Sequence, residues 1–161
     1  MNEHVTTVEF YEGGVVYITL CAVPTREDLK SNFLGPLNAM LDAEKTFSVI
    51  VDSTRVVSAN MTLVTTVMSW LRSNRERFKH FLRCTSIITR GSLIRNILDM
   101  IFRVQTPVAP MKVVHTDPEA WDFVHSVESN IREASALVRE ELSKSVDEPD
   151  SGDESTAEDD D

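Results

Sequence analysis

Two short runs rich in hydrophobic residues flank a glycine pair near the start of the chain. TVEFY and VVYITL lie on either side of Glu12, Gly13 and Gly14. Glycine adopts the positive φ that a tight hairpin turn requires, so this pattern predicts an opening β-hairpin.

After the hairpin, apolar residues at helical spacing alternate with short apolar runs. FSVIV at 47–51, CTSIIT at 84–89 and MKVV at 111–114 are expected to be strands. The predicted helices begin after Thr25 with a kink or restart at Gly35-Pro36, cover about 61–78, follow Ser92, and cover about 118–143. The order ββαβαβαβα predicts an α/β fold, with a small mixed, mostly parallel sheet and helices packed against it.

The last predicted helix opens at Asp117 as N-cap, with Pro118 at the first helical position. Its later turns are apolar at Ile131, Ala134, Leu137, Val138 and Leu142. Packing back onto the sheet is the interpretation that we favour. If the small sheet does not cover these residues, they form a homodimer or partner surface.

Composition divides the chain into two parts. The 161 residues, 42% of them hydrophobic, suit one domain, and the formal charge is −10. Residues 145–161 hold nine acidic residues and no basic one, which leaves the rest nearly neutral. Such a segment cannot bury enough surface to offset its ordering entropy. We therefore predict an α/β domain over 1–143 and a disordered acidic tail over 144–161.

Four hydroxyl residues in or beside this tail have an acidic residue three positions later. They are Ser145, Ser151, Ser155 and Thr156. Acidophilic kinases favour this pattern, and phosphates would deepen the negative charge. The alternative is a solubilising tail in which serine and acidic residues occur together for reasons of composition alone.

Basic residues gather in the segment 72–103, which has eight bases against Glu76 and Asp99. The predicted basic patch comprises Arg72, Arg75, Arg77, Lys79 and Arg83. No interleaved aromatic residues offer a stacking platform, and the acidic tail would compete for the patch, so we expect no nucleic-acid partner. An acidic protein surface, a phosphorylated group or the tail itself fits better; a solvated helix face is the alternative.

The sequence contains no recognisable catalytic, metal or phosphate-binding motif. Cys21 and Cys84 lie far apart in apolar runs and are expected to be buried thiols, and no metal or cofactor is predicted. Asp52 ends a predicted strand without a second carboxylate nearby, and His115 is more typical of a surface or capping residue than of a ligand. We expect a cytoplasmic protein without a membrane span and without enzymatic activity.

Several segments together resemble a STAS domain, the anti-sigma-factor-antagonist fold. They are the hairpin with its alternating elements, "FSVIVDST", "FLRCTSIITRGSLIRNIL" and "MKVVHTDPEAWDFV". The last segment resembles a divergent STAS-like branch that is related in shape to Sec14 lipid-binding domains. The resemblance covers about residues 6–126 and implies a non-enzymatic regulatory module.

The antagonist branch also implies a candidate regulatory site. It carries a DS[ST]G-like signature in which a Ser or Thr at a helix start is phosphorylated. Alignment on Asp52 places Asn60 at the signature's Asp, Thr62 at the phospho-acceptor and Leu63 where the family has Gly. The expected partner-binding loop comprises Asp52, Ser58, Asn60 and Thr62. In the alternative interpretation, Asn60 or Ser58 is only an N-cap and Thr62 an early helical residue.

Two hypotheses of different classes follow. The first is a regulatory or adaptor domain that acts by protein–protein interaction and is modulated by Ser/Thr phosphorylation; the resemblance implies a kinase or another STAS-type domain as partner. The second is a Sec14-like binder of a lipid or another small apolar ligand, which predicts an internal cavity. An enzyme ranks third because no catalytic constellation is recognisable.

Overall fold

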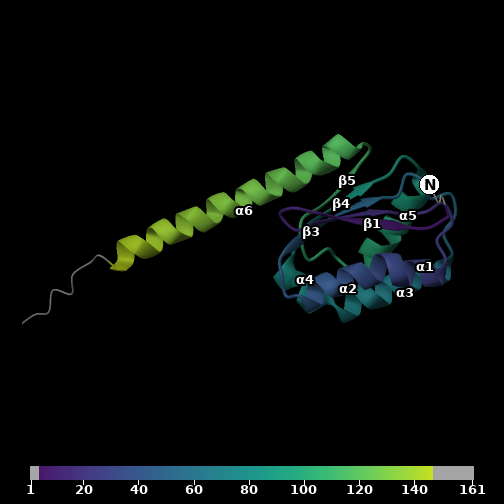
Figure 1. Ribbon diagram of the computed structural model, residues 1–161, viewed down its shortest axis with the longest axis horizontal. Helices are drawn as coiled ribbons and strands as arrows, with labels where there is room; N and C mark the ends of the chain where they lie inside the picture. The colour runs from purple at the N-terminus through teal and green to yellow at the C-terminus, as the bar shows by residue number, and fades with distance from the viewer. Residues whose placement is uncertain (1–3, 147–161) are drawn as a thin grey trace, which may run out of the picture. The chain divides into compact units, whose positions relative to one another are not determined.

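The computed structural model describes residues 4–146 and forms a five-stranded sheet in the order β1-β2-β3-β4-β5 (Figure 1). β1 (Thr7–Tyr11) and β2 (Val15–Thr19) pair antiparallel as the opening hairpin. β3 (Phe47–Asp52), β4 (Leu82–Ile88) and β5 (Met111–Val114) continue the sheet in parallel. The predicted α/β fold with a mixed, mostly parallel sheet is confirmed.

The hairpin turn and the first helical region follow the local sequence. Gly13 and Gly14 both have φ near +80°, the conformation that glycine accepts without steric cost. The first helical region is α1 (Arg26–Leu29), a π-helical turn η1 (Lys30–Leu34) and α2 (Gly35–Asp42). Because Pro36 lacks an N–H, the helix restarts at the predicted Gly35-Pro36 step, and the π turn is the form of that restart.

The single helix predicted over about 61–78 is wrong, because the structure has two helices there. α3 (Met61–Ser73) ends at Asn74, whose φ of −105° and ψ of 10° lie outside the helical region, and α4 (Arg75–Phe81) follows. The Asn74 side-chain amide donates to the carbonyl oxygen of Trp70 at 3.0 Å. Asparagine competes in this way with the helical backbone, which the spacing of apolar residues does not reveal.

The predicted N-cap of the last helix is displaced by one residue. α6 (Asp117–Val146) begins with Asp117 already helical. The Glu119 carboxylate accepts from the backbone N–H of Thr116 at 3.1 Å, and the Thr116 hydroxyl accepts from the N–H of Glu119 at 3.4 Å. This reciprocal capping box makes Thr116 the N-cap. Backbone hydrogen bonds from His115 and Thr116 lower the pKa of Glu119.

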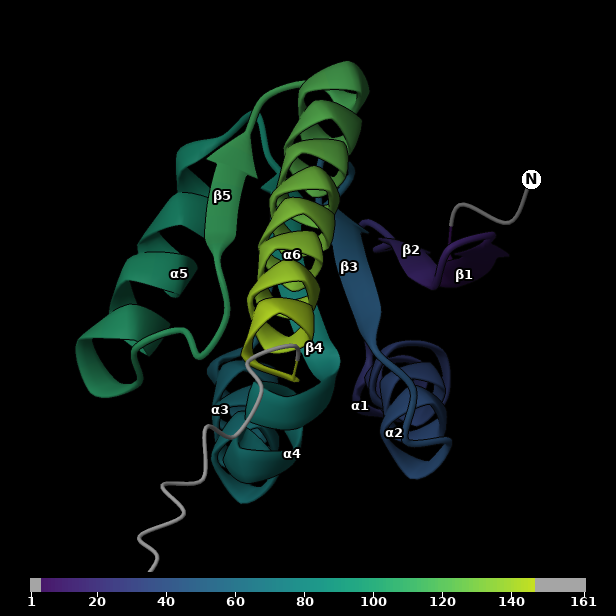
Figure 2. The same ribbon diagram turned by 90° about the vertical axis from the view of Figure 1, so that its left-hand side faces the viewer.

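The two faces of the sheet carry separate hydrophobic clusters. On one face, Val15, Ile50 and Ile88 pack under the start of α6, where Ala120 and Val124 are fully buried. On the other face, β-strand residues pack against α2, α3, α4 and α5 (Ser92–Val104), which Figure 2 shows together with β3, β4 and β5. The strand residues alternate between the two clusters because successive side chains point to opposite faces.

The described chain divides into two units at Glu128. The second unit continues α6 through Val146, so residues 144–146 are helical, and residues 147–161 of the predicted tail lie outside the described residues. Ile131, Leu137, Val138 and Leu142 of this unit are exposed, and whether they pack onto the sheet or form a partner surface stays a prediction. No helix within residues 4–146 has both the length and the apolar character to cross a bilayer.

Candidate functional site

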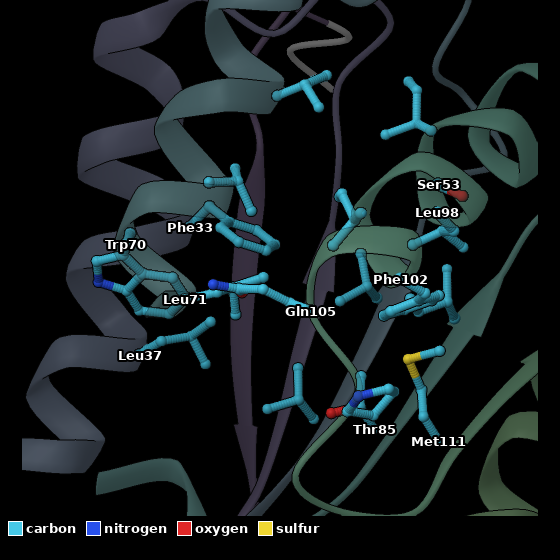
Figure 3. A pocket seen from close by; sticks show the side chains of 18 of the residues that line it. Phe33, Leu37, Ser53, Trp70, Leu71, Thr85, Leu98, Phe102, Gln105 and Met111 are labelled. Carbon is cyan, nitrogen blue, oxygen red and sulfur yellow. The ribbon is translucent and has the colours of Figure 1, made fainter. Parts of the chain in front are cut away.

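An apolar cavity of the described chain lies between the sheet and the helices α3 and α5. It has a volume of about 270 Å³ (Figure 3). Val49, Val51 and Ile87 form its floor on β3 and β4, while side chains of α3 and α5 form its walls. The wall residues include Leu63, Val64, Val67, Trp70, Ile94, Ile97, Leu98 and Phe102. A concave, mostly apolar site of this kind is typical of small-molecule binding.

The cavity exists because the apolar residues of α5 do not pack closely against the sheet. Of the apolar stripe on α5, Ile101 alone is buried; Leu93 is 36% exposed and Ile94, Ile97 and Leu98 are half-buried. On the other face of the sheet, Ala120 and Val124 of α6 are fully buried in the cluster with Ile50 and Ile88. The sequence identified the α5 stripe but gave no measure of its distance from the sheet.

Polar groups of the cavity gather at one end. α3 starts near the carboxyl ends of the strands and runs back, so Arg75 lies at their amino ends, as do Gln105 and Thr106 after α5. The Arg75 guanidinium donates to the carbonyl oxygen of Thr106 at 2.9 Å. Figure 3 shows the Gln105 side chain extending across the cavity toward Leu71. At the opposite end, the hydroxyl of Ser53 is occupied by a hydrogen bond to the carbonyl of Ile88.

The predicted partner-binding loop follows β3 and borders the same cavity. Asp52 accepts from the backbone N–H of Thr54 at 2.9 Å and from its hydroxyl at 2.7 Å, so its carboxylate closes a local turn. Ser58 is exposed, and its N–H contacts the carbonyl of Ala22 at 3.4 Å. Asp52 is therefore bound within its own turn and is not placed as a catalytic acid.

Asn60 and Thr62 open α3 at the end of this loop. The Asn60 side chain accepts from the N–H of Thr62 at 2.7 Å, which makes Asn60 the N-cap. Thr62 is exposed in the first turn, and its carbonyl accepts from the hydroxyls of Thr65 and Thr66. Leu63, at the position of the family's Gly, is buried. The geometry is that of a capped helix start with an accessible hydroxyl beside it.

The five residues of the predicted basic patch have different surroundings. Arg77 pairs with Asp42, and Lys79 pairs with Glu76 at 2.7 Å, which lowers the pKa of Glu76. Arg72 is exposed in the last turn of α3, and Arg75 lines the cavity. The last of the five, Arg83, is mostly buried.

Arg83 sits at an irregularity between β3 and β4. The register there passes from Phe47 opposite Leu82 to Ser48 opposite Cys84, so Arg83 has no strand partner. A bulge of this kind redirects a side chain, and the guanidinium donates to the carbonyls of Gly13 and Gly14 in the hairpin turn. It also lies 3.5 Å from a carboxylate oxygen of Glu128. These contacts give Arg83 a structural role in the hairpin.

The remaining candidate groups do not form a reactive cluster in the described part of the chain. His115 contacts the carbonyl of Thr89 through Nδ1 and Arg95 through Nε2. Cys21 and Cys84 are both free and buried, and burial raises the pKa of the Cys84 thiol. Among residues 4–146, no group of three His, Cys, Asp or Glu side chains suits a metal ion.

Of the predicted tail phosphosites, Ser145 alone falls within the described residues. Its hydroxyl donates to the carbonyl of Leu142 at 2.8 Å, and its side chain is exposed on α6. Ser151, Ser155 and Thr156 lie outside the described residues. Their modification stays a prediction.

These features define an α/β protein with a SpoIIAA-like, that is STAS-like, fold. A solved structure that it resembles is an uncharacterized protein of the DUF3478 family with a SpoIIAA-like fold from Shewanella loihica PV-4. The likeness has a TM-score of 0.56 at 15% sequence identity and covers 76% of this chain and 96% of that chain. No protein-family model matches the sequence, and no curated protein matches it. At this identity the likeness shows the fold alone.

Proposed function

We propose that this protein is a non-enzymatic binding module that holds a small apolar or amphipathic molecule in the cavity between α3, α5 and the sheet. The observation that carries the proposal is the unfilled space of about 270 Å³ behind a helix with a single buried residue. This is the second hypothesis from the sequence, and the cavity raises it above the first.

The energetic argument concerns the apolar walls. Side chains such as Ile97 and Leu98 are only half-buried at the cavity and keep apolar surface accessible. Covering such surface is worth roughly 25 cal/mol per Å², or about 0.8 kcal/mol for each methylene group of a ligand. A hydrocarbon chain of several methylenes therefore suffices to offset the cost of association in part and to stabilise α5 against the sheet.

The test is the binding of the neutral, fluorescent, apolar dye Nile red to the purified protein. Leu98→Trp fills the cavity from α5, whereas Leu93→Trp places the same side chain on the same helix outside the cavity lining. We expect Leu98→Trp to weaken dye binding at least tenfold and Leu93→Trp to leave it within about twofold. Native mass spectrometry of the untreated protein should in addition detect a co-purified ligand.

Equal binding by both variants would place the dye elsewhere and refute the proposal. Failure of the unchanged protein to bind the dye, together with a ligand-free mass, would do the same. Circular dichroism of both variants establishes that they are folded, so that lost binding is attributable to the filled cavity.

A protein partner at the start of α3 is the second candidate function. Val57 is 72% exposed and Met61 is 56% exposed on either side of the Asn60 cap, so apolar contact surface surrounds the accessible Thr62. A phosphate on Thr62 would lie at the positive end of the α3 dipole and would change this surface by about −1.5 to −2 charges.

This candidate predicts that Thr62 and its surroundings control binding to a specific protein. Thr62→Glu should abolish recovery of a partner that the unchanged protein retains, while Thr65→Glu, an exposed position one turn later, should not. Recovery of the same proteins by all three forms would reject a switch at Thr62. The comparison uses quantitative mass spectrometry of proteins retained on each immobilised form.

A further inference from the structure

The cavity has a single charged residue in its lining, and that residue is at one end. Arg75 is half-buried where α4 begins, and all other lining residues of the described chain are neutral. Building on the proposed function, we propose that the ligand is a single-chain amphiphile whose carboxylate pairs with Arg75 while its hydrocarbon chain occupies the cavity.

The Arg75 guanidinium is available for such a pairing. It has five N–H donors, and its hydrogen bond within residues 4–146 uses Nη1 and the carbonyl of Thr106. The neighbouring carboxylate of Glu76 is paired with Lys79, and no carboxylate of the described chain lies within ion-pair distance of Arg75. By contrast, Arg77 and Arg83 both contact carboxylates. The remaining donors of Arg75 match the two oxygens of a carboxylate.

Gln105 supplies a second polar group at this end. Its carboxamide extends into the cavity, and no hydrogen bond of its side chain is found within the described residues (Figure 3). An amide N–H₂ donates to a carboxylate oxygen. Arg75 and Gln105 therefore form a polar end opposite the apolar wall residues, which is the arrangement that orients an amphiphile.

Arg75 carries the one full positive charge in the described lining, so it is the main source of attraction for an anion. α3 and α5 both end near the amino ends of the strands, and the carbonyl ends of helices carry partial negative charge. These helix ends disfavour a bound anion, so removal of the guanidinium should remove the preference for a negative head. The volume of about 270 Å³ lies just below the range of about 300–1,000 Å³ typical of ligand pockets, which favours one hydrocarbon chain over two.

The test compares dodecanoate with dodecanol, two probes with the same chain and different head groups. Each displaces Nile red from the unchanged protein, from Arg75→Gln and from Arg72→Gln, at pH 8 and below the micellar concentration. Arg72→Gln is the matched control because it removes the same charge from the end of α3 outside the cavity lining. We expect the unchanged protein and Arg72→Gln to prefer dodecanoate by about tenfold or more.

Arg75→Gln should bind both probes with similar affinity and keep its affinity for dodecanol. Equal binding of the two probes by the unchanged protein would overturn the carboxylate assignment and leave the apolar site in place. Equal losses of dodecanoate binding in both variants would also overturn it, because long-range charge would then be the cause. Displacement of Nile red by neither probe would overturn the amphiphile assignment, whereas failure of Nile red itself to bind would count against the proposed function. The comparison of dodecanoate with dodecanol on the unchanged protein does not depend on whether the variants fold.

Discussion

The two faces of one small sheet differ in how closely their helices cover them. Under α6, Ile50, Ala120 and Val124 are fully excluded from solvent. Under α5, a cavity of about 270 Å³ remains, and Ile101 is the single buried residue of that helix. Both helices carry an apolar stripe, so an apolar stripe alone does not ensure that a helix excludes solvent from the face of the sheet that it covers.

The difference follows from the side chains at the closest approach. Ala120 has no atom beyond Cβ, so α6 comes close enough to exclude water from β-strand side chains. α5 presents larger side chains, and its ends are joined through Gly91 and through a breaker-rich segment at 105–110 that lines the cavity. Close packing of an interior requires matched shapes as well as apolar chemistry.

The largest effect is expected when an isoleucine is replaced by alanine on each side of the sheet. Ile50→Ala removes a fully buried side chain on the α6 face and should lower the free energy of unfolding by roughly 2–5 kcal/mol. Ile97→Ala removes a half-buried side chain beside the cavity and should cost less than about 1.5 kcal/mol. Urea denaturation measures both. Equal costs would show that α5 closes the cavity in solution and would break the comparison.

A smaller effect is expected from enlarging an alanine on each side. Ala120→Leu overpacks the closed face and should cost about 1–3 kcal/mol of unfolding free energy. Ala109→Leu adds the same atoms to the cavity lining and should change stability by less than about 0.5 kcal/mol. Thermal unfolding followed by circular dichroism provides the measurement. A large loss for Ala109→Leu would mean that the cavity does not accept added volume.

The smallest effect concerns α1, which begins at the edge of the cavity-bearing side of the sheet. The Asp28 carboxylate accepts from the N–H of Thr6 at 2.9 Å and from its hydroxyl at 2.6 Å. Desolvation opposes ionisation of Asp28, but hydrogen bonds from Thr6 and Asn32 outweigh it and lower the pKa. Asp28→Asn should therefore lower stability by about 1 kcal/mol at pH 7.

The pH dependence of this effect has a definite sign. Because the pKa is lower in the folded state, the stabilisation is present above the unfolded value of about 4 and is lost as pH falls through the folded value. The difference between Asp28→Asn and the unchanged protein should shrink below about pH 4. Glu27→Gln, an exposed neighbour, should change stability by less than about 0.5 kcal/mol at either pH. A constant difference across this range would exclude the charge of Asp28 as its source.

The sequence predicted the fold well where the signals were local and repeated. The hairpin glycines, the β-branched run at β3 and the restart at Gly35-Pro36 all correspond to the observed elements. The errors came from single polar side chains that compete with the backbone. Asn74 ends α3 early, and Thr116 instead of Asp117 caps α6.

The candidate sites illustrate the same limit. The loop from Asp52 to Thr62 was found from the order of elements, and its position after β3 and before α3 is as expected. The sequence predicted a cavity only under the second of two hypotheses, because apolar stripes are compatible with a closed core as well as with a pocket. Arg75 was one of five basic residues with nothing in the sequence to separate it from Arg77.

The sequence by itself thus determined the order of elements, the mostly parallel sheet and the position of the capped helix start. These depend on periodicity, glycine conformation and proline chemistry, which act over a few residues. The tertiary structure alone decided which helix closes its face and which leaves a cavity with Arg75 at its end. That outcome depends on how side chains from β3, β4, α3 and α5 fit together, and local sequence carries no information on the distance between them.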